Sequence, residues 1–214
     1  MKNILCYGDS NTHGYIPNEG GRYPREIRWP GRLQKMFGDE AYIIEEALNG
    51  RTTVWEDPIE GFKSGKSYLI PCLNSHKPID VFVLMLGTND LKSRFSLTAF
   101  EISKGCETLI KMVKAETPFS QGYVPEILLV SPIHMSAGID NHRFGGQFLG
   151  ESCEKRSREF AKYYRAIAEA QNCHFMDAAE FATASEKDFL HMDEKGHEAF
   201  ANAIYAKLQE ILNK

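Results

Sequence analysis

The residues best suited to chemistry in this 214-residue sequence are a serine, a histidine and an aspartate. A serine hydroxyl becomes nucleophilic when a neighbouring base takes its proton, and His191 is the natural base for Ser10. Asp188 lies three positions before His191, so one turn of chain can bring its carboxylate to the imidazole. That contact would fix the tautomer and stabilise the imidazolium that forms on proton transfer. The pattern therefore predicts nucleophilic catalysis by Ser10.

Two further segments carry groups that could stabilise an oxyanion. Gly50 has no side chain, so its backbone N–H can come close to a reacting oxygen. The side-chain amide of Asn89 adds a second donor, and the backbone N–H of Ser10 adds a third. Such donors are typically worth about 3–4 kcal/mol each in the transition state. Four residues next to these segments are predicted to contact the substrate: Asp9, Asn11, His13 and Trp55.

Short apolar runs precede most of these segments and predict buried strands. The runs cover residues 4–7, 41–44, 81–86, 127–130 and 174–176. Runs that are apolar throughout, rather than alternating, suit a parallel sheet that is covered on both faces. Ligands bind at the carboxyl ends of such strands. The segments that carry Ser10, Gly50, Asn89 and the Asp188–His191 pair are therefore expected to meet at one edge of the sheet.

Helical patterns alternate with the strands, which favours a layered α/β fold. Thr98 and Glu101 form a capping box that begins one predicted helix. A second helix is predicted over residues 160–171, and the last helix is predicted to follow Asp193, a suitable N-cap. Two segments, residues 51–78 and 133–150, receive no assignment. Long irregular segments of this kind are usually functional or mobile.

Composition and charge narrow the class of protein. Hydrophobic residues make up 43% and charged residues 25%, which is typical of a globular domain. The net charge of −4 gives the chain no electrostatic reason to bind nucleic acid or anionic membranes. The five cysteines have no C-x-x-C spacing, so neither a disulfide framework nor a zinc finger is predicted. No signal-peptide core or membrane span is visible, so the expected location is the cytoplasm.

The sequence lacks the motifs that bind a cofactor or a metal, but it leaves one non-catalytic alternative open. There is no Gly-x-Gly-x-x-Gly, and residues 61–67 have one residue too few for a phosphate-binding loop, so no cofactor is expected. His191 precedes the last helix and cannot share a helical face with His197, so no metal is expected there. A non-catalytic module that binds a small ligand or a protein at the same edge stays open. Such a module would not need Asp188 and His191 together.

Four motifs in the chain resemble the signature blocks of the SGNH hydrolases, also called the GDSL esterase/lipase family. They are Gly8-Asp9-Ser10, Asn49-Gly50, Gly87-Thr88-Asn89-Asp90 and Asp188-x-x-His191, in family order. The resemblance extends from residue 4 to about residue 212. Residues 45–48, 51–53, 67–69 and 84–86 look like the small bacterial arylesterase/acyltransferase branch. That branch tends to have Trp where this chain has His13, a departure that concerns the shape of the substrate pocket.

The resemblance implies a fold and a function. The fold would be one domain over residues 1–214, a three-layer αβα sandwich with a flavodoxin-like, five-stranded parallel sheet of order 2-1-3-4-5. Ser10 would be the nucleophile, Asp188 and His191 the other triad members, and Gly50 and Asn89 oxyanion donors. The expected activity is hydrolysis of small acyl esters through an acyl-enzyme, with acyl transfer as a second outcome. The expected assembly is a homo-oligomer.

Overall fold

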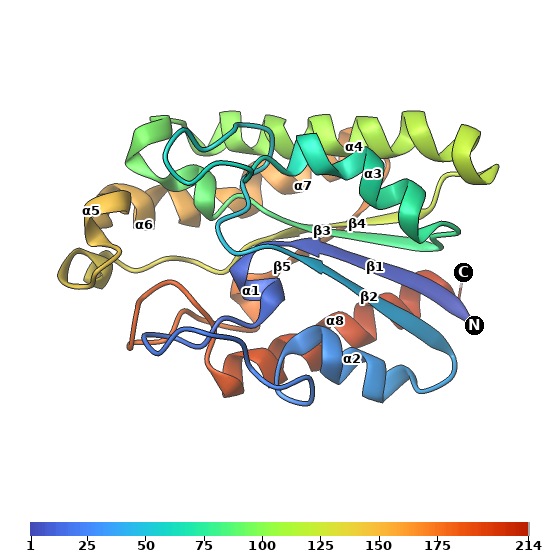
Figure 1. Cartoon of the computed structure of the whole chain (residues 1–214), viewed down its shortest axis with the longest axis horizontal. Coiled ribbons are helices and arrows are strands. Elements are labelled where there is room, and N and C mark those ends of the chain that lie inside the picture. Colours follow the sequence, from blue (N-terminus) through green and yellow to red (C-terminus); the bar gives the residue numbers. More distant parts are fainter. Residues whose placement is uncertain (214) are drawn as a thin grey trace.

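A five-stranded parallel sheet forms the centre of the computed structural model, which describes residues 1–213 (Figure 1). Its strands are β1 (Lys2–Gly8), β2 (Ala41–Ala47), β3 (Val81–Met85), β4 (Glu126–Ser131) and β5 (His174–Asp177). They lie side by side in the order β2-β1-β3-β4-β5. Every apolar run that predicts a strand forms one, and the predicted α/β fold class and strand order are confirmed.

Helices cover both faces of the sheet (Figure 1). On one face lie α3 (Gly65–His76), α4 (Ala99–Gln121) and α7 (Phe160–Ala170), and on the other α2 (Trp29–Phe37) and α8 (Glu194–Leu212). Three further helices are α1 (Ser10–His13), α5 (Gly145–Phe148) and α6 (Gly150–Arg158). None of the helices within residues 1–213 combines the length and the apolar character needed to cross a membrane.

Strand side chains alternate between the two cores because successive residues of a strand point to opposite faces. Leu5 and Leu84 pack in the core beneath α3, α4 and α7, whereas Cys6 and Val83 pack beneath α2 and α8. All four are buried. Continuous apolar runs are therefore required, since neither face of the sheet meets water.

The predicted helix caps form as expected. Thr98 Oγ1 accepts a hydrogen bond from Glu101 N at 3.2 Å, and Glu101 Oε2 accepts one from Thr98 N at 2.8 Å. Asp193 caps α8 by accepting from Gly196 N at 2.8 Å. The side-chain oxygens thus satisfy N–H groups that have no partner inside the helix.

Among the helices that were not anticipated from the sequence, two cover faces of the sheet. Within the unassigned residues 51–78, α3 turns Leu69, Cys72 and Leu73 inward at helical spacing, but Pro71 inside the helix interrupts the local signal. The other is α2, which begins at Trp29 and has Pro30 in its first turn. Proline is tolerated there because the first N–H groups of a helix have no partner inside the helix.

The register of the sheet brings three turns to one place. Gly8, the last residue of β1, lies opposite Ala47 of β2 and Met85 of β3. The chain crosses from β1 to β2 on one side and later returns to β3 on the other, so a crevice opens at this reversal of strand order. The segments that follow the three strands therefore meet there.

Candidate active site

Ser10 stands where β1 meets α1, at the carboxyl edge of the sheet. The preceding Asp9 caps α1, since its Oδ1 accepts a hydrogen bond from Asn11 N at 3.0 Å. Ser10 is almost completely buried. Its Oγ lies 2.9 Å from Nε2 of His191, a residue 181 positions further along the chain.

Asp188 holds the other side of the imidazole. Its Oδ2 lies 2.7 Å from His191 Nδ1, and its Oδ1 accepts from the backbone N–H groups of Leu190 and His191 at 3.1 and 3.0 Å. Phe189 has a φ of 61°, and this left-handed residue lets the chain turn back between the two side chains. Burial raises the pKa of Asp188, but the hydrogen bonds and the charge of His191 outweigh burial and lower it.

An ionised Asp188 determines what His191 can do. Because the carboxylate can only accept, the proton of the ring is on Nδ1, which donates a hydrogen bond to Asp188. Nε2 of a neutral ring is then free to accept the Ser10 proton. The structure thus brings together the three residues that the sequence singles out, and it places them in the order hydroxyl, imidazole, carboxylate.

Gly50 and Asn89 lie beside Ser10 on the wall of the same cavity. Gly50 has a φ of 82°, and its N–H donates to no acceptor among residues 1–213. A side chain there would be strained, and a Cβ would lie 2.7 Å from Glu60 Oε2. The Asn89 amide donates one of its two N–H groups to the carbonyl of Arg51 at 3.1 Å. Both positions can therefore present a donor to a reacting oxygen.

The loops that carry Gly50 and Asn89 are tied to each other and to β1. Arg51 Nη1 donates to the carbonyls of Gly8 and Glu46 at 3.1 and 2.6 Å. The buried carboxyl group of Asp90 accepts from Thr53 N at 3.0 Å and from Thr53 Oγ1 at 2.6 Å. These bonds cross between segments far apart in sequence, so the donors are held in fixed positions.

The cavity in front of Ser10 has a volume of about 170 Å³ and is lined by two kinds of side chain. The aromatic and aliphatic ones, here called the apolar wall, are Tyr15, Phe144, Phe148 and Leu190. The polar and charged ones, here called the charged wall, are Glu60, Lys63, Lys92 and Gln147. The Tyr15 ring packs against the His191 ring with centroids 4.4 Å apart, so the apolar wall reaches the imidazole.

Sequence reasoning did not identify these wall residues. Phe144 and Phe148 lie in the unassigned residues 133–150, and their spacing of four was the only available signal. Tyr15 directly follows the turn that ends α1, and nothing in its neighbours marks it.

A buried ion network fixes the charged wall. Lys92 Nζ lies 3.2 Å from Asp57 Oδ2 and 2.5 Å from Glu60 Oε1, while Arg94 bonds Asp57 at 2.8 Å. Burial raises the pKa of Asp57, yet backbone N–H groups and the two cations hold it well below its usual range. Arg94 also donates to Gln147 Oε1 at 2.8 Å. The network therefore links Gln147 of α5 to Glu60 and Lys92 within the charged wall.

The four residues predicted to contact the substrate are not among those that line this cavity. Asp9 caps α1, and His13 is half-buried at its end. Asn11 directs its amide to the backbone of the histidine loop, donating to the Leu190 carbonyl at 3.3 Å and accepting from Met192 N at 2.9 Å. Trp55 packs on α4, where a Cβ at Gly105 would lie 2.9 Å from its ring.

The residues considered for a metal near His191 are engaged separately. His191 pairs with Asp188, Asp193 caps α8, and His197 Nδ1 accepts from Trp29 N at 3.4 Å. Within residues 1–213, one group of side chains has the spacing of a metal site, and it lies elsewhere.

Comparison with known proteins gives one matching family model and several similar solved structures. The model of the GDSL-like lipase/acylhydrolase family matches residues 6–199. Est24, a carbohydrate acetylesterase from Sinorhizobium meliloti, is 32% identical with a TM-score of 0.92 over 99% of this chain and 100% of that one. The aryl esterase of M. smegmatis is 31% identical with a TM-score of 0.92 over 98% and 99%. None of the curated proteins matches the chain.

Proposed function

Because the chain belongs to the GDSL-like lipase/acylhydrolase family and is an ester hydrolase, we propose that it cleaves small acyl esters through an acyl-enzyme on Ser10. The observation that carries this proposal is the hydrogen-bonded series from Ser10 through His191 to Asp188, which opens onto a small cavity. Family membership favours this activity over a non-catalytic binding module.

In the proposed reaction, His191 Nε2 takes the Ser10 proton while Oγ attacks the acyl carbon. The imidazolium then gives that proton to the departing alcohol, and the Ser10 ester remains. Water attacks this ester with the same histidine as base, which releases the acid and restores the hydroxyl. Asp188 stabilises the imidazolium in both steps.

The oxyanion that forms in each step requires donors that are already in place. The N–H groups of Ser10 and Gly50 and the amide of Asn89 are the proposed donors. The hydrogen bonds of Arg51 and Asp90 that fix the loops of Gly50 and Asn89 support this proposal. A donor that is already in place needs no rearrangement when charge develops.

The size of the cavity supports short acyl groups. About 170 Å³ is below the roughly 300–1,000 Å³ of pockets that enclose drug-sized ligands. Est24 is a carbohydrate acetylesterase, and the M. smegmatis relative is an aryl esterase. We therefore propose acetyl esters as the best substrates, with an alcohol part that contacts the charged wall around Glu60 and Lys63.

The test is turnover of acetyl, butyryl and octanoyl esters by the wild type and by Ser10→Ala. We expect acetyl esters to be cleaved fastest, and we expect Ser10→Ala to lose measurable turnover while it keeps the wild-type thermal stability. Ser152→Ala, which removes an exposed serine hydroxyl on α6, is the matched control. Wild-type rates in Ser10→Ala would overturn the nucleophile, and preference for octanoyl esters would overturn the substrate class. Adding an alcohol acceptor to the same assay measures acyl transfer.

A further inference from the structure

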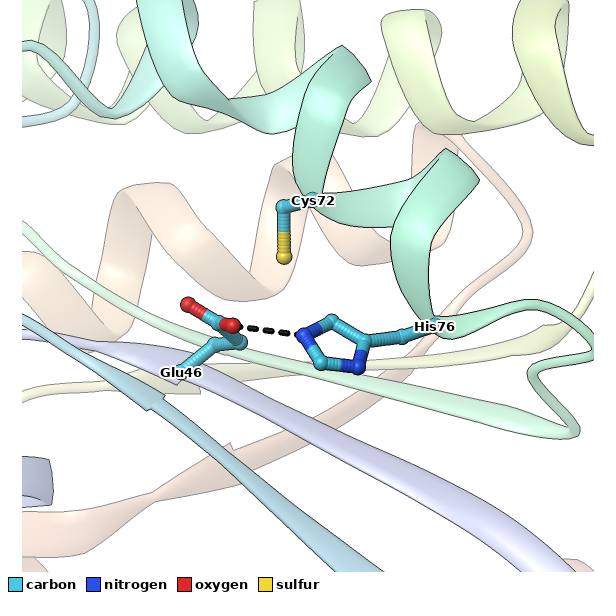
Figure 2. A group of neighbouring side chains, drawn as sticks. All are labelled: Glu46, Cys72 and His76. Atoms are coloured by element: carbon cyan, nitrogen blue, oxygen red, sulfur yellow. Dashed lines mark hydrogen bonds and ion pairs between the residues drawn. The ribbon is translucent and has the colours of Figure 1, made fainter.

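Glu46, Cys72 and His76 converge on one point between β2 and α3 (Figure 2). Cys72 and His76 are four residues apart on α3, so they share a face of that helix. Glu46 comes from β2, and its Oε1 lies 2.6 Å from His76 Nε2. None of the three lines the cavity in front of Ser10, so this cluster is separate from the proposed active site.

The three side chains offer the ligand atoms that zinc binds, namely a thiolate sulfur, an imidazole nitrogen and a carboxylate oxygen. These atoms lie within 4.8 Å of one another. A point within about 2.8 Å of all three therefore exists (4.8 Å divided by √3), close to the roughly 2.0–2.3 Å of zinc–ligand bonds. Side-chain movements of less than about 1 Å would complete the contacts.

The surroundings give a cation a route to the cluster. Glu46 and Tyr68 line a surface groove of about 500 Å³, and His76 is partly exposed, so solvent reaches the cluster and can fill a fourth ligand position. Burial raises the pKa of the Cys72 thiol to about 12, with a further contribution from Glu46 and an opposing one from Arg51. The thiol therefore stays neutral until a metal replaces its proton.

We propose that Glu46, Cys72 and His76 bind a zinc-like divalent metal ion. On binding, the Cys72 S–H bond breaks, the sulfur electron pair forms the bond to the metal, and the proton passes to water. The proton that His76 Nε2 shares with Glu46 moves to Nδ1, which leaves the Nε2 lone pair for the metal. The site joins β2 to α3, so occupancy is expected to stabilise the fold.

The experiment is a titration of the chelator-treated protein with Cd²⁺, followed by competition with Zn²⁺. We expect one equivalent of Cd²⁺ to produce the ultraviolet absorption of a cadmium–thiolate bond, Zn²⁺ to displace it, and the unfolding temperature to rise. Cys72→Ser should lose the absorption. His76→Gln and Glu46→Gln should keep it but weaken binding at least tenfold.

Two variants control for other cysteines and for other histidine–glutamate pairs. Cys173→Ser removes a half-buried thiol on another part of the surface. His174→Gln removes a ring that pairs with Glu126 at 2.8 Å, much as His76 pairs with Glu46. Both should bind Cd²⁺ like the wild type. The proposal is overturned by a wild type without thiolate absorption, by absorption that survives in Cys72→Ser, or by equal losses in the controls. All readouts are independent of ester hydrolysis.

Discussion

Asn89 illustrates how a single residue can serve both structure and chemistry. Its side-chain nitrogen carries two hydrogens, and the carbonyl of Arg51 takes one at 3.1 Å. The other remains for the cavity that Asn89 lines together with Ser10. The bond to Arg51 orients the amide before substrate arrives, which is what a transition-state donor requires.

Replacement of this amide should slow the chemical step more than it weakens substrate binding. For Asn89→Ala we expect kcat to fall by about 10²–10³-fold with little change in KM, because the lost hydrogen bond strengthens only as the oxyanion forms. Steady-state kinetics with an acetyl ester measures both quantities. Asn74→Ala, which removes an amide from α3 far from the cavity, is the control. If kcat/KM falls only because KM rises, Asn89 acts in ground-state binding of the substrate.

The loop that carries Asp188 and His191 depends on two other elements for its position. Asn11 of α1 holds the loop backbone at Leu190 and Met192. On the opposite side, Ser136 N donates to the Phe189 carbonyl at 3.2 Å, and the Phe189 ring packs on the residues that follow β4. The loop is thus fixed between α1 and the segment after β4.

A substitution at Gly138 would test the contact between the Phe189 ring and the segment after β4. A Cβ at this position would lie 2.5 Å from the Phe189 ring, so Gly138→Ala must displace the ring of the residue that follows Asp188 in the histidine loop. We expect kcat for acetyl esters to fall about tenfold or more, because a shift of this loop moves Asp188 and His191 away from the hydrogen-bonding geometry that the reaction requires. Gly146→Ala is the matched control, because a Cβ there meets nothing within 4 Å. Equal activity in the two variants would show that the loop position does not depend on this contact.

The elements that sequence reasoning identified are those whose signals are local. Each strand is a continuous apolar run, and a parallel sheet then brings Ser10, Gly50 and Asn89 to one edge. Residues such as Tyr15 and Phe144 face the cavity only because of the path that an irregular segment takes, and no local pattern encodes that path. The same reason explains Asn11, which the sequence placed beside the substrate but which binds a loop 180 residues away.

At the scale of the whole molecule, the carboxyl groups of Asp9 and Asp90 are almost completely buried at the sheet edge, and neither forms a salt bridge with a cation of residues 1–213. Burial raises the pKa of Asp9 to about 6 and that of Asp90 to about 7, although hydrogen bonds partly oppose the effect. Asp90 is completely buried and supports the loop after β2 through Thr53. Protonation of these groups therefore affects the stability of the fold as well as the local structure.

Asp90 should make the folded state less stable as pH rises. Its pKa is raised from 3.8 to about 7, so between these values the folded chain binds more protons than the unfolded chain. The contribution of Asp90 is fully present below about pH 4 and is lost as pH rises through about 7, a change of about 4 kcal/mol. Urea unfolding at several pH values measures it as the difference between wild type and Asp90→Asn. The exposed Asp39→Asn serves as control. If wild type and Asp90→Asn differ by a constant amount from pH 4 to 8, Asp90 is ionised in the folded protein, and the opposing Thr53 bonds outweigh its burial.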